Sequence, residues 1–553
     1  APAASPPPPV PAPAPSPAAA KPATSAPPPE KKADDDAGVK KPFGAIARIA
    51  LHKDELTPRM KGRLDALIAR YNARTRKSKE HTQENRQFNA DPRVVTGFRP
   101  AVKELIYPIV IARSKGSRVW DLDGNEYVDA LNGFGCSMFG WQPDFVTEAL
   151  KKQIDQGYEI GPQTPLAAEC ARLFCELAGV DRAGFCNTGS EAVLGCLRIA
   201  RTVTGRPKTV TFSGSYHGIN DEVIVRAGKT RSLPAAPGIS AEAVTNTIVL
   251  DYGTPEALEV IRQRAKEIAA VLVEPIQSRR PEFRAREFLH EVRKITEQNG
   301  IVLIFDEVIC GFRMGMGGAQ EFFGVKADIA SYGKVIGGGL SIGVVAGKRE
   351  LMDALDGGHW QFGDDSVPTV GVTYFAGTFV RHPLAMAALR AVLTHLKKEG
   401  PGLQKRLNAL TDRMASELNA FFKSVGAPLE ARHFASLWKV VPVVEGTPWV
   451  DLLFVLLRDR GIHILDGFPC FLTTAHSDAD VDTIIRGFKE SVAELQEGGF
   501  LARGEVKTEA PVVFDAQRPP VPNARLGRDA SGTPAWFVPN PNEPGKYIKL
   551  EQS

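Results

Sequence analysis

Lys334 is the residue of this sequence that is best placed to do covalent chemistry. It lies in the segment SYGKVIGGG (residues 331–339), directly after a short apolar run. In such a loop of small residues a lysine side chain can reach inward, and its amine can form a Schiff base with an aldehyde. The alternative is a surface lysine in a glycine-rich turn. A nucleotide-binding P-loop is excluded, because the motif GxxxxGK does not occur.

Asp306 ends a wholly apolar run in the segment IFDEV (residues 304–308). Open α/β sheets bind their ligands at the carboxyl ends of the strands. A carboxylate at that place could pair with a cationic ring nitrogen, whereas an unpaired carboxylate would be costly to bury. The alternative is an acid that caps a following helix.

Three polar segments could bind a flat, phosphorylated ligand. NTGSEA (residues 187–192) opens a helical pattern, and free N–H groups at a helix start favour an anion. SYHG follows a strand pattern, so its Tyr216 could stack on a ring. Thr378 follows a glycine and offers a hydroxyl to a phosphate. The alternatives are an ordinary helix cap, formed by Thr188 or Ser190, and a packed aromatic residue.

Together these groups meet the needs of pyridoxal 5'-phosphate (PLP). This cofactor requires a lysine for its aldehyde, an acid beside its pyridine nitrogen, donors for its phosphate and flat groups beside its ring. We therefore expect a PLP site. No motif indicates a metal site.

The elements that would position these residues alternate between strands and helices. Apolar, β-rich runs occupy residues 210–212, 248–250, 270–273, 301–305 and 344–345. Helical patterns lie between some of them, at 190–203, 255–268 and 286–299. Several of the strands are continuously apolar, which is typical of a parallel sheet covered by helices on both faces. The pattern predicts an α/β fold.

The two ends of the chain differ from this central part. Residues 1–40 are rich in Pro and Ala, which predicts an extended linker between domains. Residues 41–104 are expected to form a helical leader, with a helix that starts at Thr57-Pro58 and a polar stretch over 74–100 that wraps the surface. A final helix is expected from Ser477, followed by an extended tail.

The composition argues against several other classes of protein. A net charge of +4 over 553 residues gives no case for nucleic-acid binding, and no run of about 18 apolar residues could span a membrane. The seven cysteines form no CxxC pair, which indicates a reducing compartment without disulfides or zinc. We expect a cytoplasmic protein.

The motifs CNTGSEA, SYHG, LVEPIQ, IFDEV, SYGKVIGGG and AGTFVRHPLAMAA together resemble the class III aminotransferases of fold type I. The run DEVICGFRMGMGGAQEFFGV is especially similar to the glutamate-1-semialdehyde aminomutase branch. The resemblance covers about residues 105–497. It implies a large PLP-binding domain with a mostly parallel seven-stranded sheet between helices, and a smaller α/β domain. The implied boundaries are 105–165 for the N-terminal segment of the small domain, 166–382 for the large domain, 383–497 for the C-terminal small domain and 498–553 for an extended linker.

The resemblance implies a role for the residues that carry the motifs. Lys334 would hold PLP as a Schiff base and move the proton, and Asp306 would pair with the pyridine nitrogen. Tyr216 would stack on one face of the ring with His217 beside it. Val308 would pack on the opposite face.

The other implied contacts are with the phosphate and the ring substituents. Gly189 and Ser190 would bind the phosphate. Glu274 and Gln277 would line the cofactor region, with Gln277 near the phenolic oxygen. Thr378 would reach the phosphate of the neighbouring subunit, which requires a homodimer.

The sequence departs from the aminomutase pattern on the substrate side. Residues 467–473 contain no acid where the aminomutase carries a gating glutamate, Gly140-Trp141 replaces the usual Gly-His, and residues 107–114 do not match the segment that binds a small substrate's carboxylate. Four aromatic residues could border a pocket for an apolar or elongated substrate, or could be core packing. They are Phe139, Trp141, Phe468 and Phe471.

The flanking segments resemble those of aminotransferase domains embedded in hybrid polyketide–nonribosomal peptide synthetases. The similar parts are residues 56–100, the run EPIQSRRPEF and the tail over 534–547. This implies transfer of an amino group from an amino acid donor to a 3-oxoacyl thioester on an acyl carrier protein, beside adjacent synthetase domains. The alternatives are an aminomutase or aminotransferase for a free keto or aldehyde substrate, and an inactive dimerisation module. Arginines at 279, 280, 284 and 286 could meet an acidic carrier or form an exposed basic loop.

Overall fold

The computed structural model describes residues 49, 54–228, 231–444, 449–504, 525–528, 534–539 and 547–549. The expected linker over 1–40 lies outside the described residues, as does most of the expected tail. Within that tail, three short strands form an antiparallel sheet where an extended chain was expected. They are β17 (Arg525–Arg528), β18 (Pro534–Pro539) and β19 (Tyr547–Lys549).

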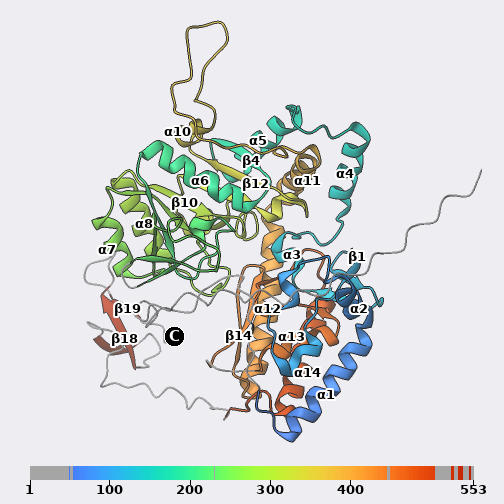
Figure 1. The fold of residues 1–553 in the computed structure, drawn as a ribbon. Coiled ribbons are helices and arrows are strands. Elements are labelled where there is room, and N and C mark those ends of the chain that lie inside the picture. Colours follow the sequence, from blue (N-terminus) through green and yellow to red (C-terminus); the bar gives the residue numbers. More distant parts are fainter. Residues whose placement is uncertain are drawn as a thin grey trace, which may run out of the picture.

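A seven-stranded sheet forms the centre of the larger lobe (Figure 1). Its strands lie in the order β4 (Arg182–Cys186), β12 (Gly343–Gly347), β11 (Ile329–Gly333), β10 (Val302–Asp306), β9 (Ile268–Val273), β5 (Lys208–Phe212) and β8 (Thr247–Leu250). Strand β12 runs antiparallel to both of its neighbours, and the other pairs are parallel. The predicted mostly parallel sheet is confirmed.

Helices cover both faces of this sheet, which explains why its strands are apolar throughout. In β9 the side chains of Ala270 and Leu272 pack on one face with α6, while Val271 and Val273 belong to the core on the other face, with α8. The covering helices are α5 (Pro165–Ala178), α6 (Gly189–Thr204), α7 (Pro255–Gln263), α8 (Arg286–Gln298), α10 (Arg349–Met352) and α11 (Pro383–Glu399).

The smaller lobe combines segments that precede and follow the seven-stranded sheet in the chain. Strands β1 (Ile111–Lys115), β2 (Arg118–Asp121) and β3 (Glu126–Asp129) form a meander, and β15 (Ile462–His463) pairs in parallel with β3. A second sheet contains β13 (Leu429–Phe434), β14 (Leu437–Pro442) and β16 (Cys470–Phe471). The helices of this lobe are α12 (Gly402–Ser424), α13 (Asp451–Asp459) and α14 (Asp478–Gly498). Strands β2 and β3 form a hairpin around Asp123-Gly124-Asn125.

Shorter elements connect the two lobes and the sheet. The helices are α3 (Asn132–Gly135), α4 (Asp144–Gln156) and α9 (Gly318–Phe323). The 3₁₀ turns are η1 (Pro92–Val94), η2 (Pro100–Leu105), η3 (Asp221–Val223), η4 (Lys334–Gly337) and η5 (Asp353–Leu355). Strands β6 (Val225–Ala227) and β7 (Ser232–Pro234) form a small antiparallel pair.

Helix α1 (Pro58–Arg74) begins where the sequence predicts, because the Thr57 hydroxyl accepts a hydrogen bond from the N–H of Met60 at 3.2 Å. The helix packs on the smaller lobe. Its Arg70 forms ion pairs with Asp459 at 2.5 Å and Glu494 at 3.0 Å. Within the polar stretch over 74–100, residues 76–85 form a second helix, α2.

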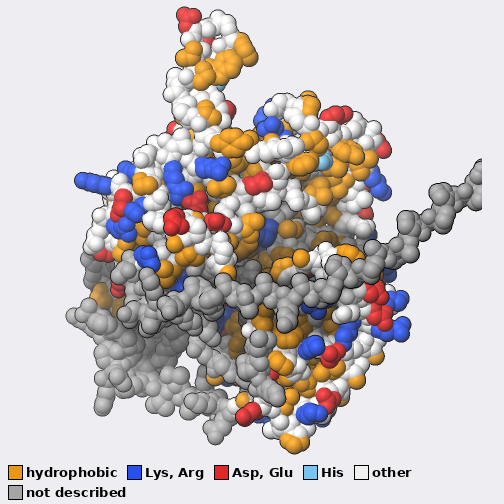
Figure 2. Space-filling model, in the orientation of Figure 1, with side chains coloured by type: hydrophobic (Ala, Val, Ile, Leu, Met, Phe, Trp, Pro, Cys, Tyr) orange, Lys and Arg blue, Asp and Glu red, His pale blue; other side chains and the backbone are white. Residues whose placement is uncertain are grey.

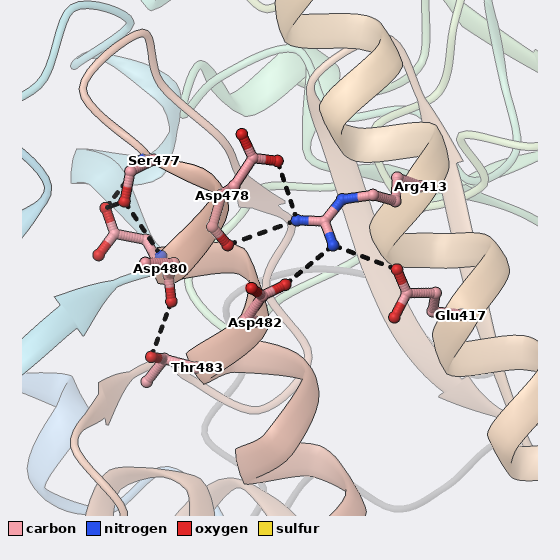
Figure 3. A network of polar contacts seen from close by, with 8 residues as sticks. Arg413, Glu417, Ser477, Asp478, Asp480, Asp482 and Thr483 are labelled. Carbon is pink, nitrogen blue, oxygen red and sulfur yellow. Dashed lines mark hydrogen bonds and ion pairs between the residues drawn. The ribbon is translucent and has the colours of Figure 1, made fainter.

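Helix α14 begins at Ser477, as predicted, with a reciprocal cap between Ser477 and Asp480. On the facing helix α12, Arg413 reaches across to the first turns of α14 (Figure 3). Three carboxylates contact its guanidinium, those of Glu417, Asp478 and Asp482. This network joins the two longest helices of the smaller lobe.

Among the helices that the structure describes, none combines the length and the hydropathy that a membrane crossing requires.

Candidate active site

A cavity of about 330 Å³ lies at the carboxyl ends of the central strands. Loops that follow β4, β5, β9, β10 and β11 all contribute to its wall. Eight of the ten residues predicted from the sequence line this cavity. They are Gly189, Ser190, Tyr216, His217, Glu274, Asp306, Val308 and Lys334.

Asp306 is held rigidly at the end of β10. It is buried, and its Oδ1 accepts hydrogen bonds from Ser331 Oγ at 3.0 Å and from the N–H of Val308 at 3.2 Å. Its Oδ2 lies 2.8 Å from Nδ1 of His217, which is also buried. Nε2 of His217 has no hydrogen-bond partner among the described residues. These contacts fix a carboxylate at the cavity wall, where it can pair with a cationic ligand atom.

Lys334 follows β11 and has a left-handed backbone conformation, with φ of 47°. Such a conformation costs a residue other than glycine roughly 1–2 kcal/mol, and it persists where the surroundings enforce it. Burial lowers the pKa of the Lys334 amine, although Cys136, Asp306 and Glu274 raise it in part. A lowered pKa increases the fraction of neutral amine, which is the nucleophilic form.

The start of helix α6 faces the same cavity. The Thr188 side chain caps the helix by accepting from the N–H of Glu191 at 3.2 Å, so the ordinary cap that the sequence also allowed is present. Gly189 has no room for a side chain, because an added Cβ would lie 2.9 Å from both methyl groups of Val308. Because Gly189 has no side chain, an anionic group can come close to the free N–H groups at the start of α6.

These features fit PLP. The cavity combines an amine of lowered pKa, a fixed carboxylate, the N-terminal end of a helix, and Tyr216 and Val308 as flat and apolar neighbours. These are the four kinds of group that the cofactor requires.

Comparison with known proteins agrees with this fit. The family model described as aminotransferase class-III matches residues 100–432. The chain belongs to this family. Its cofactor is PLP, and it is a PLP-dependent aminotransferase of fold type I.

Several relatives of this class-III aminotransferase have names that indicate a reaction. The chain is 33% identical over 418 residues to glutamate-1-semialdehyde 2,1-aminomutase of Archaeoglobus fulgidus, covering 72% of this chain and 94% of that protein. It resembles the structure of a β-phenylalanine aminotransferase from Variovorax paradoxus, with a TM-score of 0.68 and 26% identity, over 80% of this chain and 100% of that chain. A transaminase with PLP bound superimposes with a TM-score of 0.67 at 28% identity, over 77% and 99% of the two chains.

Glu274 of the aminotransferase is tied to the loop that carries Tyr216. Its Oε2 accepts from the N–H of Tyr216 at 3.0 Å, and its Oε1 accepts from the N–H of Ser278 at 2.8 Å. Burial raises the pKa of Glu274. The guanidinium of Arg279 lies 5.7 Å from the centre of the Tyr216 ring. Glu274 therefore positions Tyr216 as well as lining the cavity.

The two remaining predicted residues do not line the cavity. The amide nitrogen of Gln277 donates to Ser213 O at 3.0 Å and to Ser215 Oγ at 2.9 Å, so this side chain supports the Tyr216 loop from behind. Thr378 is exposed and lies in the long segment between η5 and α11. Part of that segment projects from the body of the molecule above α10 (Figure 1). The roles expected of Gln277 at the phenolic oxygen and of Thr378 at a partner's phosphate stay predictions.

Of the two alternatives for the four aromatic residues, the pocket border is not formed and the packing is observed. None of the four residues lines the cavity, because they pack elsewhere: Phe139 lies edge-on to Phe145 with ring centroids 5.3 Å apart, and Phe471 is fully buried. Phe134 lines the cavity instead, with Phe468 behind it at 5.1 Å between ring centroids. The glycines on both sides of Phe134 were the signal that could have identified this turn.

The basic loop is exposed in part, because Arg284 and Arg286 are exposed whereas Arg279 and Arg280 are half-buried. The guanidinium groups of Arg280 and Arg284 lie over the rings of Phe283 and Phe434, at 5.1 and 4.9 Å from the centroids. Arg286 donates to the carbonyl oxygens of residues 322 and 323. These arginines are therefore engaged within the chain, which weakens the case for a carrier-binding surface there.

Proposed function

We propose that this aminotransferase transfers an amino group from an amino acid donor to a 3-oxoacyl thioester held on an acyl carrier protein. The product would be a 3-aminoacyl intermediate of hybrid polyketide–nonribosomal peptide biosynthesis in the cytoplasm, with neighbouring synthetase domains as partners. The observation that carries the proposal is the apolar side chain of Phe134 in the cavity wall, which Phe468 backs from outside the cavity. Phe468 lies in the segment where the aminomutase carries an acid.

The carboxylates of the cavity support the same reading. Those that line it are Asp306 and Glu274, and both accept hydrogen bonds from N–H groups of the chain itself. Neither is available as a mobile gate. In addition, the structural neighbour from Variovorax paradoxus acts, by its name, on β-phenylalanine, which carries its amino group on carbon 3.

The residues of the cavity have distinct tasks in this reaction. PLP, when bound, supplies the electron sink. With PLP bound, the neutral amine of Lys334 would take a proton from the α-carbon of the donor and deliver it to the cofactor side, a transfer that typically contributes roughly 10²–10⁴-fold to the rate. Asp306, oriented by Ser331, keeps a negative charge beside the ring nitrogen. Gly189 and Ser190 bind the phosphate at the start of α6.

The proposal includes a homodimer in which Thr378 completes the partner's phosphate site. Thr378 is exposed, and hydrophobic side chains gather on the projecting loop before it (Figure 2). In the segment between η5 and α11, Phe362 is 91% exposed and Val367 is 62% exposed. Exposed apolar side chains that lie together support an interface at this place. A monomer in sedimentation experiments, with full PLP binding, would contradict this part of the proposal.

The deciding experiment offers the same 3-oxoacyl group in two forms, as a carrier-bound thioester and as the free acid. We expect amination of the thioester, detected as a mass change on the carrier protein, and little reaction of the free acid. Lys334→Ala serves as the inactive control. A clear preference for the free acid would contradict the proposal.

A second candidate is an aminomutase or aminotransferase that acts on a small free substrate. The identity to glutamate-1-semialdehyde aminomutases favours it, because the match covers 94% of the Archaeoglobus protein. Conversion of glutamate-1-semialdehyde by the purified protein would support this candidate. An inactive dimerisation module is disfavoured by the complete set of cofactor groups, and a protein that fails to bind added PLP would revive it.

A further inference from the structure

The wall of the cavity that contains Phe134 is a strained turn. Residues 132–135 all have positive φ, with values of 49° for Asn132, 60° for Gly133, 57° for Phe134 and 93° for Gly135. A left-handed conformation is unfavourable for residues with side chains, and it costs a bulky residue such as Phe134 the most. Such a run persists only where the surrounding structure holds it.

Asp129 holds the start of this turn. Its Oδ1 accepts hydrogen bonds from the N–H groups of residues 131 and 132, at 3.0 and 3.2 Å. Its Oδ2 accepts from the indole of Trp141 at 2.8 Å, and Nδ1 of His463 lies 2.9 Å from Oδ1. Burial alone would raise the pKa of Asp129, but the contacts with His463 and Trp141 bring it below its usual value. The carboxylate is therefore a charged anchor.

Arg313 holds the end of the turn. Its Nη2 donates to the carbonyl oxygen of Gly135, its Nη1 donates to Ser436 Oγ at 3.1 Å, and its Nε donates to Ile309 O at 3.2 Å. The guanidinium also lies over the ring of Phe471, 4.5 Å from the centroid. Phe471 in turn accepts from the amide of the Asn132 side chain through its carbonyl oxygen, at 2.7 Å.

The arginine has no ordinary charged partner. It is 2% exposed, and no carboxylate of the described residues forms an ion pair with it. Burial lowers its pKa to about 10. A buried cation that contacts only neutral acceptors is costly, so its three directed hydrogen bonds must serve a purpose that an apolar side chain could not.

The turn has no space to relax around Arg313. A Cβ added to Gly135 would lie 2.9 Å from Cζ of Phe471 and 3.2 Å from Nη2 of Arg313. The backbone therefore touches the side chains that hold it, and Phe134 is presented to the cavity in one direction.

We propose that Arg313 is a positioning residue that sets which acyl chains the cavity accepts, by holding residues 132–135 in their left-handed form. The phosphate, the ring and the reactive amine are assigned to α6, Asp306 and Lys334, so the wall at Phe134 is left for the substrate. For the identity of the substrate, this inference rests on the proposed function. The claim that Arg313 holds the turn is independent of the proposed function.

The test uses the PLP-loaded protein and the substitution Arg313→Lys, which keeps a positive charge but loses the directed fork of donors. We expect hydrogen exchange in peptides that span 130–140 to rise by about tenfold or more, which corresponds to the loss of one hydrogen bond to a charged group. Peptides that span 329–340 and the absorption band of bound PLP should stay unchanged. The matched control is Arg206→Lys, because Arg206 also donates to several carbonyl oxygens but lies outside the cavity lining.

The second readout is the choice between substrates. The two substrates are a short and a long 3-oxoacyl thioester, 3-oxobutanoyl and 3-oxododecanoyl. The ratio of their kcat/KM values should differ by about tenfold between Arg313→Lys and the wild type, through a change in KM, because this is again the effect of one hydrogen bond to a charged group. If neither thioester reacts, the proposed function fails, but the exchange result still tests Arg313. Two results would overturn the inference. One is an equal increase of hydrogen exchange in the peptides that span 130–140 and 329–340, and the other is unchanged exchange in the peptides that span 130–140. Ser436→Ala removes a single acceptor of Arg313 and should give a smaller effect in the same direction if Arg313→Lys does not fold.

Discussion

Glu307 should make the folded protein less stable as the pH rises from acidic to mildly alkaline values. The side chain is 1% exposed and follows Asp306 at the end of β10. Its two oxygens accept hydrogen bonds from the N–H groups of Ala319 and Gln320, each at 3.1 Å. Burial nevertheless raises the pKa of Glu307 from 4.5 to about 7, against the effect of these hydrogen bonds.

The sign of the effect follows from proton binding. Because the folded state binds the proton of Glu307 more tightly than the unfolded state, its contribution to stability is complete below pH 4.5. That contribution is lost as the pH rises through about 7. The difference between the two pKa values corresponds to a loss of roughly 3 kcal/mol in the free energy of unfolding.

The substitution Glu307→Gln tests this reasoning. The amide can accept from one of the two N–H groups but not from both, so the variant should be less stable than wild type at pH 5 by about 1–3 kcal/mol. The gap should narrow or reverse by pH 8, because only the wild type loses stability over that range. Urea unfolding at matched PLP concentration measures both values across the pH range. The exposed Glu321 of the same turn, changed to Gln, is the control, and a gap that is constant with pH would refute the argument.

Three further predictions concern the cofactor and the smaller lobe. Lys334→Ala should abolish the visible absorption of bound PLP, since no amine remains to join the aldehyde; a variant that keeps the band would contradict the assignment. Gly189→Ala should weaken PLP binding about tenfold in titrations of the apoprotein, because overpacking against Val308 costs about 1–3 kcal/mol. Arg413→Ala should lower the free energy of unfolding in urea by less than about 1 kcal/mol, since its ion pairs are solvent-exposed. Asp480→Ala should lower it by about 2 kcal/mol, because it removes a helix cap and the buried partner of Arg118. Equal losses for the two variants would contradict this ranking.

The cofactor side of the cavity could be predicted because its residues follow from local patterns. Asp306 ends an otherwise apolar strand and Lys334 follows a short buried strand; these strands, β10 and β11, are adjacent, with Asp306 paired to Ser331. Parallel strands bring their carboxyl ends to one edge, so residues far apart in the chain meet there. The start of α6 was visible for the same kind of reason, in a cap followed by a helical pattern.

The substrate side could not be predicted, because it depends on contacts between distant segments. Arg313 and Gly135 are 178 residues apart, and nothing in the local sequence of either one indicates the hydrogen bond between them. Aromatic residue type alone also failed to distinguish Phe134, which faces the cavity, from Phe471, which is fully buried. Both side chains are equally apolar, and only the left-handed turn decides which of them a ligand can touch.

The contacts between α1 and the smaller lobe determine where this enzyme can be truncated or transplanted. A boundary placed at residue 100, where the family match begins, would remove Arg70 and leave the carboxylate of Asp459, only 7% exposed, without its cation. It would also uncover the apolar faces against which Leu64, Leu67 and Tyr71 pack. A transplanted unit that starts just before Thr57 would keep helix α1 and its contacts. It should therefore tolerate a new upstream domain far better than a unit that starts at residue 100.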